Sequence, residues 1–143
     1  MPNDDRDTVI WMRPEITGRG RQPAYSRERI AQAAITIADA EGLDAVSMRR
    51  VAAEIGAGTM SLYRYVRNKD ELHQLMVDFG IDPEDMPDTM EWSKALREIA
   101  VRSRELAHCH PWYPALAAGM AFPGPRALFG FERMMSYLDG LGL

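Results

Sequence analysis

The chain has 143 residues, of which 46% are hydrophobic and 27% are charged, and its net charge is −4. This mixture is typical of one globular domain and excludes a wholly disordered chain. No apolar run is long enough to cross a bilayer, the acidic N-terminus lacks a signal-peptide pattern, and the single cysteine, Cys109, excludes an internal disulfide. We therefore expect a cytoplasmic protein with no membrane partner.

Charge is distributed unevenly along the chain. Residues 1–69 have a net charge of +2, whereas residues 70–143 have a net charge of −6. The segment 47–69 contains five basic residues and a single acid, Glu54. A basic block on an acidic body predicts a face that meets a polyanion, and the alternative is a solvated helix face.

The first predicted elements are an arm and a helix. Residues 1–24 mix charge with Gly and Pro, so we expect a flexible arm in which only the apolar stretch 9–11 can dock. Ser26 is an N-cap type, and apolar residues then recur at helical spacing until Gly42, which suits the C′ position. The pattern predicts a helix over about 27–41.

Two short helices are predicted next. One begins after Ser47 and ends at Gly56, where we expect a Cβ to crowd the following helix or to demand an unfavourable φ. The other runs from about Thr59 or Met60 to Tyr65. A short helix, a turn with glycine and a second short helix form the helix-turn-helix pattern.

The rest of the chain also reads as helical. Asn68 is expected to cap a helix over about 69–80, and the acidic, proline-containing segment 81–90 connects it to the later helices. Those helices are predicted at about 89–108, 111–119 and 126–139. Because no strand alternation is found, the predicted fold class is all-α.

The helix-turn-helix leaves a set of side chains free for contact. Val51, Ile55 and Leu62 are expected to pack inward, so the outward set comprises Thr59, Met60, Ser61, Arg64 and Tyr65. Such side chains can hydrogen-bond to base edges, stack, or touch a thymine methyl group in a major groove. The alternative is a small helical hairpin that binds no nucleic acid, and the basic flank favours DNA.

The stretch 26–78 resembles the N-terminal DNA-binding domain of the tetracycline-repressor (TetR) family. That family closes this domain with the pattern LY-x-x-V-x-NK-x-x-L, which is matched here by Leu62, Tyr63, Val66, Asn68, Lys69 and Leu72. The arm resembles the start of one large branch of the family. Residues 110–119 and 122–135 are similar to the front half of the tetracycline-repressor type of C-terminal domain.

The resemblance implies roles for individual residues. Phosphate contacts are implied for Ser47, Tyr63 and Lys69, and base contacts for Arg49, Thr59, Met60, Ser61, Arg64 and Tyr65. Arg49 is the best guanine candidate, because a guanidinium can bond O6 and N7 together, whereas Arg64 can equally be a solvated or phosphate-bound arginine. Arg19 and Arg21 are expected in an adjacent minor groove, with a disordered arm as the alternative.

The resemblance also implies a small-molecule inducer bound between helices in the second half. We expect a hydrophobic or amphipathic ligand, and the predicted pocket residues are Phe79, Trp92, Met120, Phe122, Phe129 and Met134. The alternative is that these side chains are simply core. His108 and His110 are two residues apart and point to different helix faces, so we expect no metal and no cofactor. No histidine here matches the one with which tetracycline repressors hold drug and magnesium.

The predicted organisation is an arm at 1–24, a DNA-binding domain at 25–72, and a partial ligand-binding and dimerisation domain at 73–143. Chains of the family are usually longer, so this chain is expected to lack the last helices, which form the dimer interface. No nucleophile–base pair or phosphate loop is seen, which argues against an enzyme. We predict a homodimeric regulator, a repressor that a small ligand releases from a palindromic double-stranded operator. The alternative is a helical ligand-binding or scaffolding protein.

Overall fold

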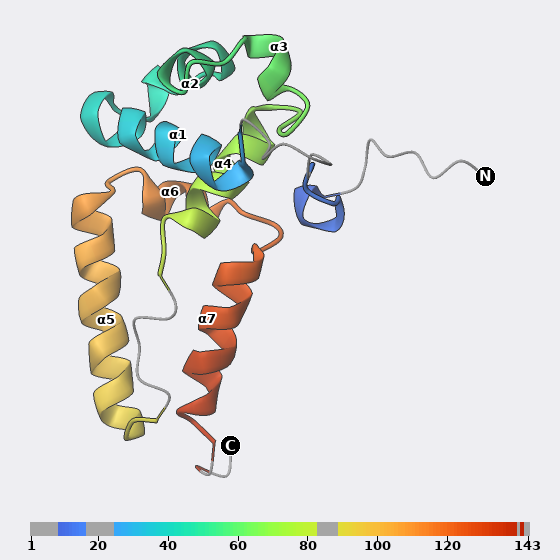
Figure 1. Cartoon of the computed structure of the whole chain (residues 1–143). Helices are drawn as coiled ribbons and strands as arrows, with labels where there is room; N and C mark the ends of the chain where they lie inside the picture. Colours follow the sequence, from blue (N-terminus) through green and yellow to red (C-terminus); the bar gives the residue numbers. More distant parts are fainter. Residues whose placement is uncertain (1–8, 17–24, 83–88, 140, 142–143) are drawn as a thin grey trace. The chain divides into compact units, whose positions relative to one another are not determined.

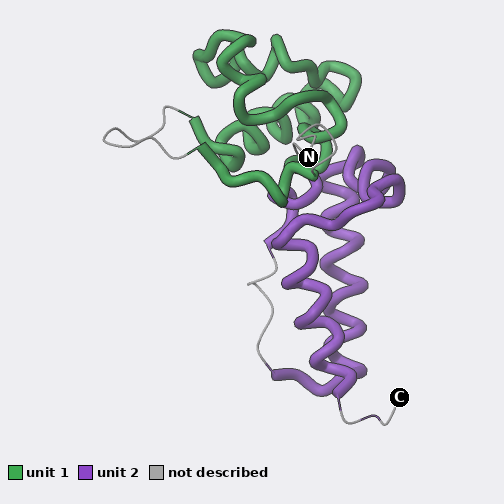
Figure 2. Tube along the Cα trace, turned by 90° about the vertical axis from the view of Figure 1, so that its right-hand side faces the viewer, with its two compact units in different colours: residues 1–76 green, residues 77–143 purple. Residues whose placement is uncertain are grey.

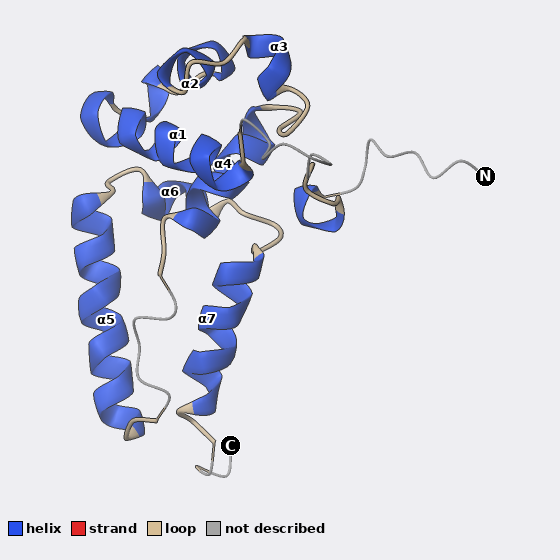
Figure 3. Cartoon of the chain, in the orientation of Figure 1, coloured by secondary structure: helices blue, strands red, loops and turns tan. Residues whose placement is uncertain are grey.

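The computed structural model describes residues 9–16, 25–82, 89–139 and 141, and Arg19 and Arg21 lie outside these ranges. The helices, labelled in Figure 1, are η1 (Ile10–Met12), α1 (Arg27–Glu41), η2 (Leu43–Ala45), α2 (Met48–Glu54), α3 (Thr59–Leu62), α4 (Lys69–Phe79), α5 (Trp92–Cys109), α6 (Tyr113–Ala118) and α7 (Pro125–Ser136). No strand occurs in the described ranges, and the predicted all-α fold is confirmed (Figure 3). No helix within them is long and apolar enough to cross a bilayer.

The chain divides into two compact units, Met1–Met76 and Val77–Leu143 (Figure 2). The division falls within α4, which begins in the first unit and ends in the second. We predicted the domain boundary a few residues earlier, after residue 72.

The first unit is built around small helices that share one apolar core. α1 packs against η2 and α2, and α2 packs against α3. The core includes the fully buried side chains of Ile30, Val51, Leu62 and Leu72. Burying each of them contributes about 1.5–3 kcal/mol, which helices as short as α2 and α3 need because they are marginal alone.

Side-chain caps explain where the helices of the first unit begin. The Ser26 hydroxyl oxygen accepts a hydrogen bond from the Arg29 N–H at 3.1 Å, and the Ser47 hydroxyl oxygen accepts one from the Arg50 N–H at 3.1 Å. The observed bounds of α1 are the predicted ones, and its C-cap, Gly42, has a φ of +90°. Each such cap contributes about 1 kcal/mol.

The third predicted helix is shorter than expected. α3 ends at Leu62, and residues 63–65 form a turn instead of continuing the helix to Tyr65. This turn returns the chain to the core at the fully buried Val66, three residues before α4 starts at Lys69.

The N-terminal segment is partly docked, as its apolar stretch predicted. Ile10, the first residue of η1, is fully buried, and Arg13 pairs with Glu71 of α4 through Nη2 and Oε2 at 2.7 Å. Both side chains of this ion pair are about nine-tenths buried. Residues 9–16 are therefore a structural part of the first unit.

In the second unit, α5 and α7 lie side by side and α6 follows the end of α5 (Figures 1 and 2). The first turn of α7 is capped by Asp78, from the last turn of α4. Its carboxylate accepts hydrogen bonds from the Ala127 N–H at 2.9 Å and the Arg126 N–H at 3.3 Å. Gly124, the N-cap residue, has no side chain to do so. The Arg126 guanidinium lies 5.4 Å from the centre of the Phe79 ring, which adds a cation–π contact to the same junction.

We predict that Gly56→Ala destabilises the chain by roughly 1–2 kcal/mol, since Gly56 has a φ of +70° and a left-handed conformation costs other residues about that much. The expected crowding of a Cβ is wrong, because an added Cβ would meet no atom within 4 Å. Strain at φ is therefore the whole reason for the glycine. Gly58→Ala is the matched control, because Gly58 has an ordinary φ of −75° and its added Cβ would lie 3.9 Å from the Ser61 hydroxyl. Equal shifts in thermal unfolding for the two variants would contradict this assignment.

A second prediction concerns pH. Burial raises the pKa of Asp78 above its ordinary 3.8, against the opposing effects of the Ala127 and Arg126 N–H groups and the Arg126 charge. The pKa of Tyr113 is raised by burial and, to a smaller extent, by the charge of Asp78. At pH values between the ordinary pKa of Asp78 in the unfolded chain and its raised pKa in the folded chain, the folded chain binds more protons than the unfolded chain. The stability that this proton contributes is lost as the pH rises through the raised pKa. Asp78→Asn removes it. Denaturant unfolding across this pH range should show that the free energy of unfolding of the variant rises relative to that of the parental chain as the pH rises. A difference between the two free energies that does not change with pH would contradict the prediction.

Candidate nucleic-acid interface and ligand cavity

The turn between α2 and α3 is held in place from α1. The Tyr25 hydroxyl donates to the Gly56 carbonyl at 3.4 Å, and Arg29 donates through Nη2 to the Ile55 carbonyl at 3.4 Å. The Arg29 guanidinium also lies 5.9 Å from the centre of the Tyr25 ring. This role of Tyr25 and Arg29 is not predictable from the sequence, because the bonded residues are up to 31 positions apart and no local pattern links them.

The far side of Tyr25 supports the residues that follow α3. The rings of Tyr25 and Tyr65 meet edge to face, with centres 6.4 Å apart and planes at 89°. Tyr65 is therefore half-buried in an aromatic contact and only partly available to DNA. The start of α1, the turn and the end of the α3 region form one braced assembly.

The outward side of α3 is as exposed as the helix-turn-helix pattern predicted. The Met60 side chain is 79% exposed and that of Tyr63 is 43% exposed, whereas Leu62 is fully buried. Ser61 and Arg64 are also exposed, and Thr59 is half-buried. Met60, Ser61, Tyr63 and Arg64 are thus accessible to a partner, and Thr59 is partly so.

The two arginines of α2 differ in their surroundings. Arg50 bonds to Glu41 of α1 at 2.6 Å and lies 3.5 Å from the carboxylate of Glu54. Arg49 is exposed, and no described residue forms an ion pair with it. Arg50 therefore braces the helix, while Arg49 retains its guanidinium donors for another partner.

The residues predicted to grip phosphates are all exposed. Ser47 caps α2 with its oxygen, and its hydroxyl proton can still be donated to a phosphate. Lys69 is the first residue of α4, where the helix dipole also attracts an anion. Asn68 caps this helix, its side-chain oxygen accepting from the Glu71 N–H at 2.8 Å.

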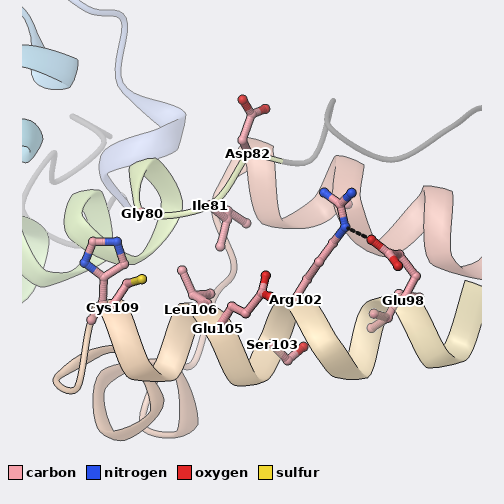
Figure 4. Close-up of a pocket in the computed structure, with 12 residues that line it drawn as sticks. Gly80, Ile81, Asp82, Glu98, Arg102, Ser103, Glu105, Leu106 and Cys109 are labelled. Carbon is pink, nitrogen blue, oxygen red and sulfur yellow. Dashed lines mark hydrogen bonds and ion pairs between the residues drawn. The ribbon is translucent and has the colours of Figure 1, made fainter.

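The second unit contains two adjoining cavities of about 500 and 450 Å³, within the range of small-molecule sites. Figure 4 shows how one face of α5 supplies polar side chains to the larger cavity, including Glu98, Arg102 and Glu105. Arg102 donates through Nε to Glu98 at 2.7 Å. Residues that line both cavities are Ile81, Ile99, Ser103, Leu106 and Gly130. The lining is therefore amphipathic.

The structure places one of the six predicted pocket residues, Met134, in the lining of a cavity. Trp92, Phe122 and Phe129 have exposed side chains, at 43%, 60% and 42%. Met120 is half-buried away from both linings, and Phe79 lies under the Arg126 guanidinium. Large Met and aromatic residues were a poor guide to the lining, because the residues that α5 contributes to the cavities are charged or of medium size.

The two histidines that drew attention do not form a metal-binding cluster. His108 is exposed, and the His110 ring lies 5.5 Å from the Trp112 ring. Across the described ranges, no three His, Cys, Asp or Glu side chains converge in a way that would hold a metal ion.

Comparison with known proteins agrees with this geometry. The family model of bacterial regulatory proteins, tetR family, matches residues 30–76. The chain is 40% identical over 138 residues to the HTH-type transcriptional repressor DrrR1 of Streptomyces coeruleorubidus, and 30% identical over 136 residues to an HTH-type transcriptional regulator of Saccharopolyspora erythraea. Each match covers 94% of this chain, but only 51% and 57% of the two relatives, so the chain spans about half their length.

Solved structures of ActR from Streptomyces coelicolor are also similar. Apo ActR has a TM-score of 0.76 at 34% identity, over 86% of this chain and 60% of that one. ActR in complex with actinorhodin has a TM-score of 0.73 at 34% identity, over 83% of this chain and 57% of that one. With its helix-turn-helix, its all-helical fold and these relatives, the chain belongs to the tetR family of bacterial regulatory proteins.

Proposed function

We propose that the chain is the DNA-binding and ligand-sensing part of a transcriptional regulator, a repressor that a small ligand releases from its operator. The observation that carries this proposal is the exposed surface of α3 together with Arg49, which pairs with no described residue, on a helix-turn-helix that Tyr25 and Arg29 brace. A helix held rigidly with its polar side outward suits a major groove. An operator-binding protein of this kind works in the cytoplasm.

Roles follow from exposure and chemistry. Arg49 is proposed to read a guanine, while Thr59, Met60 and Ser61 contact base edges or a thymine methyl group. Ser47, Tyr63 and Lys69 are proposed to hold backbone phosphates, which position the helix without reading sequence.

The adjoining cavities of the second unit are proposed as the inducer site. ActR has been solved with actinorhodin and with (S)-DNPA, so a similar protein takes small organic molecules. Here the wall from α5 is charged and polar, whereas Ile99, Leu106 and Met134 are apolar. This combination suits a ligand that has a flat apolar body and polar substituents.

A homodimer on a palindromic operator is proposed because the second unit exposes many large apolar side chains. Those on α5 and α7 are Trp92, Leu96, Val101, Leu128, Phe129, Phe131 and Met135. Apolar surface of this extent is rare on a monomer and typical of a surface that other protein covers.

Coupling between ligand and DNA is proposed to run through α4. Its first residue, Lys69, is a proposed phosphate contact, and near its end Asp78 caps α7, the helix that lines both cavities with Gly130. A ligand that favours one position of α7 therefore also favours one position of the end of α4. A coupling free energy of about 1–3 kcal/mol is typical of such systems.

For DNA binding, we predict that Arg49→Ala weakens binding to the preferred sequence by roughly 1–3 kcal/mol and relaxes preference at one base position. Lys69→Ala should weaken all sequences about equally, because it removes a phosphate contact. Arg50→Ala is the matched control, since Arg50 is held by Glu41 and Glu54 and should leave sequence preference unchanged.

The measurement is selection of bound sequences from a random duplex library, followed by fluorescence anisotropy on the preferred and on scrambled duplexes. Equal losses on both duplexes for Arg49→Ala would contradict its role as a base reader. Absence of any salt-dependent binding to duplex DNA would favour a ligand-binding or scaffolding protein instead.

For ligand binding, we predict that Ser103→Phe lowers affinity at least about tenfold, because the added ring occupies space shared by both cavities. Ala100→Phe is the control: Ala100 is an exposed residue of the same helix, and it lines neither cavity. Actinorhodin is the probe, and quenching of tryptophan fluorescence is the readout. Equal affinities of the two variants would place the ligand elsewhere.

A further inference from the structure

A small basic cavity lies in the first unit, and none of the residues proposed above to contact DNA lines it. Its volume is about 210 Å³, and the described residues that line it include four arginines, Arg13, Arg27, Arg64 and Arg67, and no acidic residue. The space is on the order of several water molecules, which is enough for a tetrahedral anion. The four arginines come from three stretches of the chain, since Arg13 precedes α1, Arg27 begins it, and Arg64 and Arg67 follow α3.

The positive charge of this cavity is only partly balanced nearby. Arg13 is paired with Glu71 at 2.7 Å, and the Glu15 carboxylate accepts from the Arg27 backbone N–H at 2.8 Å. These two carboxylates stand against the three guanidinium groups of Arg13, Arg27 and Arg64. Among the described residues, the Arg64 side chain has neither an ion pair nor a hydrogen bond. The cavity therefore keeps a surplus of positive charge.

Arg27 provides a second and independent indication. Its Nη1 donates to the Arg13 carbonyl at 3.1 Å, but its Nε is buried and has no hydrogen-bond partner in the described part of the chain. Burial has the largest effect on the pKa of Arg27 and lowers it. Smaller effects follow, in which the Glu15 charge raises the pKa, the Arg13 charge lowers it and the Glu71 charge raises it. An unpartnered buried donor costs free energy, and an anion that reached this Nε would remove that cost.

We propose that this cavity binds a phosphate group of the DNA backbone, with Arg64 and Arg27 as its principal ligands. Guanidinium groups match phosphate oxygens in shape and charge, and two of them can share one phosphate. The proposal rests on the DNA-binding function above, and it moves Arg64 from base reading to phosphate binding. Because Arg13 and Ile16 form one wall, the N-terminal segment becomes part of the DNA-binding surface.

The position of the cavity favours DNA over a free phosphate ion as the source of the anion. Arg64 and Tyr65 line the cavity, and they directly follow Tyr63, an exposed residue proposed to contact the backbone. A duplex seated on α3 would therefore carry its phosphates past the entrance.

The test is the salt dependence of binding to a mixed-sequence duplex, measured by fluorescence anisotropy on the 143-residue chain. A plot of log K, where K is the binding constant for the duplex, against log [salt] has a negative slope. Each lost phosphate contact reduces the magnitude of this slope by about 0.9. We expect this loss in Arg64→Ala and in Arg27→Ala, and no further loss in the double variant, because both residues hold the same phosphate. Combining Arg64→Ala with Lys69→Ala should give about twice the loss, because these residues hold different phosphates.

Arg97→Ala is the control. Arg97 is an exposed arginine of α5 in the other unit, and its substitution removes the same charge as Arg64→Ala. Thermal unfolding of every variant monitors folding, and the exposed Arg64 provides a variant that leaves the core intact. An unchanged slope in Arg64→Ala and Arg27→Ala, with the expected loss in Lys69→Ala, overturns this site and leaves the proposed function standing. Failure of the parental chain to bind duplex DNA overturns both.

A second arm separates the two sources of phosphate. The parental chain and Arg64→Ala are titrated with inorganic phosphate in the absence of DNA, and the melting temperature is recorded. We expect no difference between them at millimolar phosphate, because a single phosphate lacks the rest of the duplex. Stabilisation of the parental chain alone, together with unchanged DNA slopes, would assign the cavity to a free phosphate and overturn its assignment to DNA.

Discussion

One carboxylate, that of Glu71, holds together three segments of the first unit. It accepts from Arg13 at 2.7 Å and from the Arg67 backbone N–H at 2.7 Å, while the Glu71 N–H is bonded to the Asn68 cap. Only 7% of Glu71 is exposed, so its loss would leave the Arg13 charge buried without a partner. Breaking such a pair costs about 3–5 kcal/mol. The basic surface of this unit is thus organised around an acid.

Arginine has three different tasks in this small unit, and pairing separates them. Arg50 and Arg13 are bonded to carboxylates and act as braces, and Arg29 supports the turn through a carbonyl and the ring of Tyr25. Arg49 and Arg64 form no ion pair with any described residue, which leaves their guanidinium groups available for the proposed contacts with DNA. Composition alone counts all of these residues equally, although only the unpaired ones bring net charge to a polyanion.

The sequence predicted features that depend on neighbouring residues. Ser26 and Ser47 marked the starts of α1 and α2 because an N-cap bonds to an N–H only three positions away. The cavity lining was not predictable in the same way, since it depends on which face α5 turns toward α7. The cap on α7 was also missed, because Asp78 and Ala127 are 49 positions apart. The exposure of Met60 and Ser61 was easier to predict, since both lie on one short helix whose buried residue is Leu62.

The cap supplied by Asp78 has a consequence for how segments of this protein can be exchanged. The N-cap of α7, Gly124, has no side chain, and its first residue, Pro125, has no N–H, so the first free N–H groups of the helix depend on a residue of α4. A chimaera that takes α5 to α7 from a homologue would keep a well-formed start of α7 only if it also carried a carboxylate at position 78. The natural unit of recombination therefore begins inside α4, before the connector, and not at the connector itself.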